Sequence, residues 1–226
     1  MTHLKRLTSS KSVGKRKFTK YIARPNPGPH SLSESITILY LLRDILNVVK
    51  TSREAKVILN DGQVLIDGKI RKSVHFPVGF MDNISISTSN EHYMMVYDER
   101  GKLQPKKIDQ KQASQKICKV INKTVLHGNK IQINLYDSKN ILVKENSYKP
   151  GDSVLISLPD IKPQKHLKLE KGALVFLTGG KHKGKYGKVE DIKIFEGTEK
   201  NRIIISSEKE KIETLKDYAF VIDKEL

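Results

Sequence analysis

The most regular pattern of hydrophobic and polar positions lies between residues 36 and 95. Its first part has helical periodicity, with apolar side chains at Ile38, Leu41, Leu42, Ile45, Val48 and Val49. This spacing predicts one amphipathic helix. A second, shorter helix is predicted to begin at Thr51, because Thr51-Ser52-Arg53-Glu54 is a capping-box pattern. In that pattern the hydroxyl and the Glu54 carboxylate accept hydrogen bonds from amides that the helix leaves unpaired.

A strand pattern follows the second helix. Val64-Leu65-Ile66 and Lys69-Ile70-Arg71 flank Asp67-Gly68, the two-residue signal of a tight β-hairpin. Phe76-Pro77-Val78-Gly79 then turns the chain, and Ile84-Ser85-Ile86-Ser87 is typical of a further strand. Helix, helix, hairpin and strand together predict a compact module of about 60 residues, which is small for an independent fold.

The rest of the chain has strand periodicity in short segments. The strands predicted in the central part are 93–97, 117–126, 130–136, 141–144 and 154–158. Gly128-Asn129 and Pro150-Gly151-Asp152 supply turns between them. We therefore expect a multidomain α+β protein. Its expected parts are a basic N-terminal extension (1–35), the helix-and-hairpin module (36–95), a central β-rich domain (96–168) and a C-terminal β domain (169–226).

The charge balance is strongly basic. The 226 residues include 42 Lys and Arg against 25 Asp and Glu, a formal net charge of +17. A chain this basic repels itself unless a polyanion neutralises it, and nucleic acid is the default partner. A membrane surface is the competing polyanion, but the sequence has no run of about 18 apolar residues and no signal-peptide core. We expect a soluble, cytoplasmic protein.

The first 33 residues contain no acidic residue. They carry Lys5, Arg6, Lys11, Lys15, Arg16, Lys17, Lys20 and Arg24, and prolines at 25, 27 and 29 forbid a helix at their end. Such a segment buries too little apolar surface to order by itself, so we expect it to become ordered on phosphates. The alternative is a solvated tail. Its aromatic residues Phe18 and Tyr21 are equally suited to stacking on bases and to packing against protein.

A second group of cations lies on the helix-and-hairpin module. Arg53 and Lys56 fall near the start of the second helix, off its apolar stripe, and Lys69, Arg71 and Lys72 follow the hairpin turn. Together they would present a positive groove suited to a bent RNA backbone. The alternative is an ordinary solvated helix face.

Catalytic and metal-binding patterns are missing from the sequence. Cys118, the single cysteine, is expected to be a buried structural thiol, and the seven histidines lack the short spacings that zinc sites need. Gly179-x-x-x-x-Gly184-Lys185 satisfies part of a phosphate-binding loop, but Tyr186 replaces the required Ser or Thr and a strand pattern follows. We expect no catalytic residue, no metal and no cofactor, and hence a protein that is not an enzyme.

Several of these motifs resemble known RNA-binding proteins. Arg43-Asp44, Ser52–Lys56, Gly62–Arg71 and Phe76–Gly79 resemble the αL-type RNA-binding domain that is named for ribosomal protein S-four. His3–Leu7, Arg24–His30 and Tyr148–Ile156 are similar to the archaeal and eukaryotic-type S-four family of small-subunit ribosomal proteins. The resemblance covers nearly the whole chain and implies a ribosomal protein that binds ribosomal RNA.

The C-terminal part resembles a KOW motif. Gly180-x-x-Lys183-Gly184-x-x-Gly187-x-Val189 follows an apolar strand. The resemblance implies an SH3-like barrel with this loop on RNA or protein. The glycines permit positive φ and a close backbone approach, while Lys181, Lys183 and Lys185 add charge.

We therefore expect a structural constituent of the small ribosomal subunit. Its expected partners are small-subunit ribosomal RNA and neighbouring ribosomal proteins, with no small-molecule substrate, no membrane and no homo-oligomer. The expected RNA contacts are Lys5, Arg6, Lys15, Arg16, Lys17, Arg24, Arg43, Arg53, Lys56, Lys69, Arg71, Lys72, Lys181, Lys183 and Lys185. Two alternatives are an RNA-modifying enzyme with the same RNA-binding module, and a translation or transcription factor built around the KOW barrel.

Overall fold

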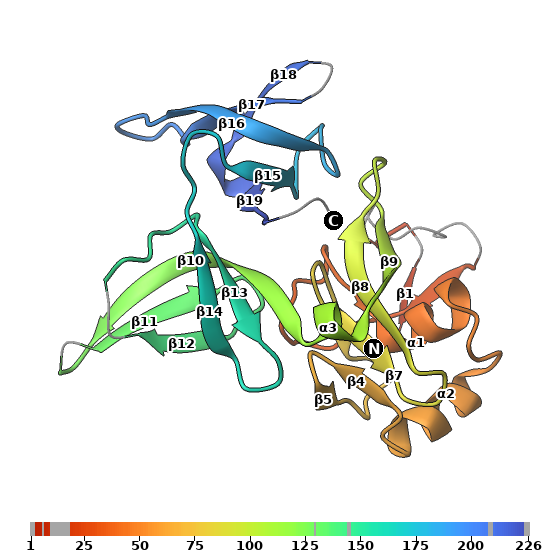
Figure 1. Cartoon of the computed structure of the whole chain (residues 1–226). Helices are drawn as coiled ribbons and strands as arrows, with labels where there is room; N and C mark the ends of the chain where they lie inside the picture. The colour runs from red at the N-terminus through yellow and green to blue at the C-terminus, as the bar shows by residue number, and fades with distance from the viewer. Residues whose placement is uncertain are drawn as a thin grey trace. The chain divides into compact units, whose positions relative to one another are not determined.

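The computed structural model describes residues 3–5, 7–9, 19–128, 130–143, 146–207 and 210–223. The chain divides into two compact units, each built mainly of antiparallel strands (Figure 1). Unit 1 comprises Met1–Tyr97, Lys102–Lys116 and Ser157–Asp160, and unit 2 comprises Asp98–Gly101, Ile117–Ile156 and Ile161–Leu226. The expected mixture of helix and sheet is present, with strands in the majority. The division into four parts stays a prediction.

The centre of unit 1 is a five-stranded antiparallel sheet in the order β5-β4-β7-β8-β9 (Figure 1). Its strands are β4 (Val64–Ile66), β5 (Lys69–Ile70), β7 (Asn83–Ile86), β8 (Glu91–Tyr97) and β9 (Leu103–Ile108). β8 pairs with both β7 and β9, so the sheet of the module continues past residue 95, where the sequence pattern predicts its end.

The predicted β4–β5 hairpin is confirmed. Ile66 pairs with Lys69, and the two residues between them both have positive φ, 51° at Asp67 and 73° at Gly68. Two consecutive positive φ values are the geometry of a type I′ turn, which Asp-Gly favours because its backbone twist matches that of the strands.

The first predicted helix is shorter than its apolar pattern. Ile36–Thr37 forms β3, a single α turn follows (α1, Ile38–Tyr40), and the chain continues as a π-helix (η1, Leu41–Ile45). Asn47 then has a φ of 54°, a left-handed conformation of the kind that ends helices. The prediction of one helix through Val49 is therefore wrong in extent, although Val49 is buried as its spacing suggests.

The second helix begins where the capping box predicts. α2 (Ser52–Asn60) has Thr51 as its N-cap, whose Oγ1 accepts a hydrogen bond from the Glu54 N–H at 3.2 Å. Glu54 Oε2 accepts from the Lys50 N–H at 2.8 Å, and this bond together with those from Thr51 lowers the pKa of Glu54. These side chains satisfy donors at the helix start that have no partner within the helix.

Short strand pairs order the described parts of the N-terminal extension. β1 (His3–Lys5) pairs antiparallel with β2 (Tyr21–Ala23), and β3 pairs with β6 (Pro77–Val78). The Asn26 N–H donates to the His75 carbonyl at 2.8 Å, which holds the proline-rich segment against the chain that precedes β6. Residues 6 and 10–18 lie outside the described part, so ordering of this arm on phosphates stays a prediction.

Unit 2 contains two five-stranded sheets. The first has the order β12-β11-β10-β13-β14 and is formed by β10 (Gln115–Leu126), β11 (Lys130–Leu135), β12 (Asn140–Val143), β13 (Ser153–Ser157) and β14 (Lys162–Leu167). The strands predicted between residues 117 and 158 are thus confirmed for the residues that the structure describes, which do not include Lys144. The sequence does not predict β14, because most of its side chains are exposed and polar and therefore lack apolar alternation. A short helix, α3 (Gln110–Ala113), precedes β10.

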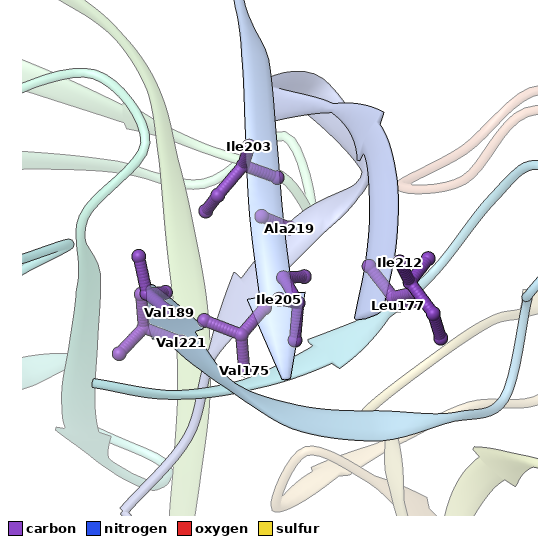
Figure 2. Packing of buried hydrophobic residues seen from close by; sticks show 8 residues of the cluster. All are labelled: Val175, Leu177, Val189, Ile203, Ile205, Ile212, Ala219 and Val221. Carbon is purple, nitrogen blue, oxygen red and sulfur yellow. The ribbon is translucent and has the colours of Figure 1, made fainter. Parts of the chain in front are cut away.

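The second sheet of unit 2 has the order β18-β17-β16-β15-β19. Its strands are β15 (Leu174–Leu177), β16 (Tyr186–Lys193), β17 (Arg202–Ser206), β18 (Lys211–Leu215) and β19 (Ala219–Val221), with the 3-10 turn η2 (Lys216–Tyr218) before the last. Figure 2 shows its core, where Val175, Leu177, Val189, Ile203, Ile205, Ile212, Ala219 and Val221 point toward one another. Burying each larger aliphatic side chain contributes about 1.5–3 kcal/mol, so this small sheet depends on its alternating inward positions.

Candidate nucleic-acid interface

A buried network of charged side chains holds the hairpin of unit 1. Lys116 Nζ lies 2.7 Å from Asp67 Oδ2 and 2.6 Å from Asp82 Oδ1. His30 Nε2 lies 2.9 Å from Asp82 Oδ2, and the Gly79 N–H donates to the same oxygen at 2.8 Å. Burial by itself raises the pKa of Asp82, but Lys116, His30 and these hydrogen bonds outweigh burial and lower the pKa below its usual range. The network therefore fixes the turn residue Asp67 against segments distant in sequence.

The cations predicted on α2 and on the hairpin lie at the surface of unit 1. Arg53 and Lys56 are exposed on α2, and Lys69 and Lys72 are exposed after the hairpin turn. Arg71 is only partly exposed, and its guanidinium lies 4.5 Å over the Phe76 ring. Such a cation–π contact stabilises the chain that follows the hairpin, so Arg71 also packs against protein.

Arg43 is held in one orientation on η1. Its Nε and Nη2 donate to the two Asp44 oxygens at 3.0 Å and 2.8 Å, and its Nη1 lies 3.4 Å from Ser52 Oγ. Three of the five guanidinium N–H groups make these bonds. The side chain is 28% exposed, so it remains accessible from solvent while its position is fixed by protein.

An open groove of about 370 Å³ lies beside Arg43 in unit 1. It is lined by His3, Tyr21, Ile22, Ala23, Leu39, Arg43, Ser52, Lys56, Val74 and His75. The structure thus brings two of the predicted cations, Arg43 and Lys56, together with the aromatic residues of β1 and β2. The hairpin cations Lys69, Arg71 and Lys72 are not among the residues that line this groove. A single positive surface formed by the helix start and the hairpin stays a prediction.

Sequence reasoning did not identify His3 and His75 as site residues. His3 lies in the His3–Leu7 motif, whose resemblance implies no role for this side chain, and His75 lies in a segment without regular periodicity. His75 Nδ1 donates to the Arg24 carbonyl at 3.0 Å, which fixes its ring beside β2. His75 and Arg24 are 51 positions apart, so the periodicity of a single segment could not predict this contact.

The predicted contacts of the N-terminal extension are only partly described. Lys5 lies on β1 and is exposed, and Arg24 is exposed directly after β2. Arg6, Lys15, Arg16 and Lys17 lie outside the described residues.

The glycine-lysine loop between β15 and β16 carries less accessible charge than its sequence suggests. Lys181 is exposed, whereas Lys183 and Lys185 are partly exposed and Lys185 Nζ lies 2.7 Å from Glu210 Oε1. This contact lowers the pKa of Glu210.

The glycines of the same loop serve the fold in two ways. Gly180 and Gly184 have positive φ, 77° and 91°, as the glycine pattern of the loop predicts. At Gly187 a Cβ would overlap the Ile205 side chain of the neighbouring strand, so this glycine permits close strand packing. The residues from Tyr186 onward form β16, which is a strand rather than the helix that a phosphate-binding loop requires.

Within the described residues, no group of three or more His, Cys, Asp or Glu side chains could hold a metal ion. Cys118 is buried, as predicted, with its thiol 3.5 Å from Asp137 Oδ2. No helix in the described part of the chain is long and apolar enough to cross a membrane.

Family models match two segments of the chain. Residues 41–84 match the S4 domain, which covers η1, α2 and the β4–β5 hairpin. Residues 89–162 match "Ribosomal family S4e", which covers β8 through β13.

Relatives match across nearly the whole chain. The small ribosomal subunit protein eS4 of Archaeoglobus fulgidus is 40% identical over 223 residues, which are 98% of this chain and 93% of that protein. The protein of the same name from Methanocaldococcus jannaschii is 40% identical over 233 residues, covering 99% of this chain and 94% of the relative.

A solved structure is similar as well. The crystal structure of the 30S ribosomal protein S4e from Thermoplasma acidophilum matches with a TM-score of 0.73 and 35% identity over 84% of this chain and 95% of that chain. Identity at this level over nearly full length, with α2 and the β4–β5 hairpin in place, shows the family: the chain belongs to the eS4 family of small ribosomal subunit proteins.

Proposed function

We propose that this chain is a structural constituent of the small ribosomal subunit that binds ribosomal RNA. The observation that carries the proposal is its similarity, over 98% of its length, to a protein named for that subunit. A formal net charge of +17 supports it, because Lys and Arg side chains that neutralise phosphates supply a large share of the affinity of proteins for nucleic acids. In this role the protein works in the cytoplasm, inside the ribosome and beside other ribosomal proteins, and it is not an enzyme.

The proposed RNA contacts fall into three groups. In unit 1 they are the cations of the S4 domain, Arg43, Arg53, Lys56, Lys69, Arg71 and Lys72. The second group is the N-terminal extension, with Lys5, Arg6, Lys15, Arg16, Lys17 and Arg24. The third is the loop between β15 and β16, with Lys181, Lys183 and Lys185. Side chains of this kind position RNA through its phosphates and carry little sequence information.

We also propose that the β15–β19 sheet is an SH3-like KOW module and that the four-part division expected from the sequence describes the protein's domains. The glycines at 180, 184 and 187 support the KOW assignment, since each permits a backbone conformation or an approach that a larger residue would obstruct. An RNA-modifying enzyme or a transient factor is not favoured, because relatives with a ribosomal name match nearly the whole chain.

Sucrose-gradient sedimentation of a cell lysate tests the proposal. The chain should travel with the small subunit in stoichiometric amount, at low salt and again at moderately high salt. Its loss to the top fractions at moderate salt would instead indicate a factor that visits the ribosome.

A further inference from the structure

We propose that the groove between the β1–β2 pair and the start of α2 binds one unpaired nucleotide of an RNA, with the base against Tyr21 and the phosphate at Arg43 and Lys56. This inference rests on the proposed RNA-binding function. The part of the RNA that binds in the groove is a nucleotide outside the base-paired stems.

The cationic side of the groove suits a phosphate. Arg43 is held by Asp44 and Ser52, so its guanidinium loses little conformational freedom when an anion binds. Lys56 lies on α2, one turn after Ser52. It lines the same groove and is exposed. Ser52 is the first residue of this nine-residue helix, and the positive end of the helix dipole therefore faces the same side.

Aromatic side chains also line the groove. The rings of His3 and Tyr21 meet edge to face, with centroids 5.6 Å apart and planes inclined by 61°. Tyr21 is nevertheless 48% exposed, so its ring remains accessible from solvent. Lys20 Nζ lies over the Tyr21 ring, 5.6 Å from its centroid, and adds a cation that a bound nucleotide meets at the ring. Unstacked bases in RNA loops bind to aromatic rings with phosphate contacts nearby, which is the combination present here.

A hydrogen-bond acceptor completes the groove. His75 Nδ1 donates to the Arg24 carbonyl, so a neutral His75 ring has Nε2 as its acceptor. An acceptor among cations does not improve phosphate binding, but it pairs with the exocyclic amino group of a base or with a ribose 2′-hydroxyl.

The size of the groove favours a single nucleotide. About 370 Å³ is in the range of small-ligand sites. An acidic peptide would satisfy Arg43 and Lys56, but it would leave the exposed ring of Tyr21 without a flat partner. A nucleotide extruded from a stem contacts both kinds of residue, with its phosphate at Arg43 and Lys56 and its base on the Tyr21 ring.

The test uses the full chain and two RNA hairpins. One carries a single bulged 2-aminopurine, and the other has the same stem with that base paired. Affinity for each RNA and quenching of 2-aminopurine are measured for the native protein, Tyr21→Ala and Tyr21→Phe. Tyr93→Ala is the matched control, because Tyr93 is partly exposed in the same unit but does not line the groove. Circular dichroism verifies that every variant is folded.

The native protein and Tyr21→Phe should prefer the bulged RNA and quench its 2-aminopurine. Tyr21→Ala should bind the bulged RNA about 5-fold to 100-fold more weakly and the paired RNA unchanged, as expected for loss of one stacked base. Equal affinities of Tyr21→Ala and native protein for the bulged RNA would overturn the inference and leave the proposed function standing. Failure of the native protein to bind either RNA would overturn both. Binding of a poly-glutamate peptide that depends on Tyr21 would assign the groove to an acidic protein segment and also overturn the inference.

Discussion

Lys116 Nζ lies 2.6 Å from Asp82 Oδ1, and both side chains are only 2% exposed. The same ammonium group reaches Asp67 in the β4–β5 turn, so one buried charge connects the start of β10 to the hairpin of the S4 domain. A buried ion pair adds little net stability compared with apolar packing, but removal of one member leaves an uncompensated charge. This relationship makes the position of the hairpin dependent on a residue far outside the matched S4 segment, which ends at residue 84.

Lys116→Met should destabilise the protein by about 3–5 kcal/mol, because two buried carboxylates lose their cation. Urea unfolding followed by circular dichroism measures the difference. Lys107→Met is the matched control, since Lys107 forms a 2.9 Å ion pair with Glu91 but is 69% exposed. The control should cost about 0–1 kcal/mol. Equal effects of the two substitutions would show that burial does not set the strength of the Lys116 contacts.

Stability should fall steeply in acid because of Asp82. The pKa of Asp82 is lowered in the folded protein, so this carboxylate stays ionised there while the unfolded chain takes up a proton near pH 4. Its contribution is therefore present above about pH 4 and is lost as the pH falls further. The free energy of unfolding, measured with urea at several pH values, should decrease less steeply for Asp82→Asn than for the native protein. Parallel curves would contradict this assignment.

Gly79→Ala should destabilise unit 1 by about 1–3 kcal/mol, the usual cost of overpacking. Gly79 has an ordinary φ, but a Cβ at this position would overlap the His30 ring. Thermal unfolding of Gly79→Ala, His30→Ala and the double variant gives the coupling between them. In the His30→Ala background the glycine substitution should cost much less. A cost that does not depend on His30 would refute the steric explanation.

Arg53→Glu and Lys69→Glu should each weaken RNA binding for all RNA sequences alike, because both side chains are proposed to contact phosphates. Each substitution should also reduce the slope of log affinity against log salt by about 1. Fluorescence anisotropy at several salt concentrations measures both effects. Lys200→Glu is the control, because Lys200 is also exposed but lies outside the proposed contacts. If all three variants behave alike, the affinity reflects net charge and not a defined surface.

Lys119 should make unit 2 more stable as the pH rises from about 8 to 10. Burial lowers the pKa of Lys119 to about 8, while its Nζ donates to the carbonyls of Asp217 and Ala219 at 2.6 Å and 2.8 Å. Between that pKa and the ordinary value near 10.4, the unfolded chain binds more protons than the folded one, so higher pH favours folding. The melting temperature of the native protein should rise across this range relative to that of Lys119→Met. A constant difference between the two would contradict the lowered pKa.

Local features of the fold were predictable from the sequence. The Asp-Gly turn and the Thr51 cap were identified correctly, because each depends on residues no more than a few positions apart. The central strands were identified for the same reason, since alternation along one strand reports which side faces the core. The class of partner was also predictable, because a net charge of +17 is a property of composition.

Contacts between distant segments were decided only by the tertiary structure. The pattern through Val49 is helical, yet the chain turns at Asn47 into a left-handed conformation. Lys116 resembles any surface lysine in the sequence, because burial of its charge depends on carboxylates 49 and 34 positions away. Tyr21 and Arg43 likewise line one groove. The hydrophobic pattern around either residue does not predict that the other lies nearby. Periodicity within a helix or strand predicts which of its sides is buried. Which other segment packs against that side depends on the packing of the whole chain.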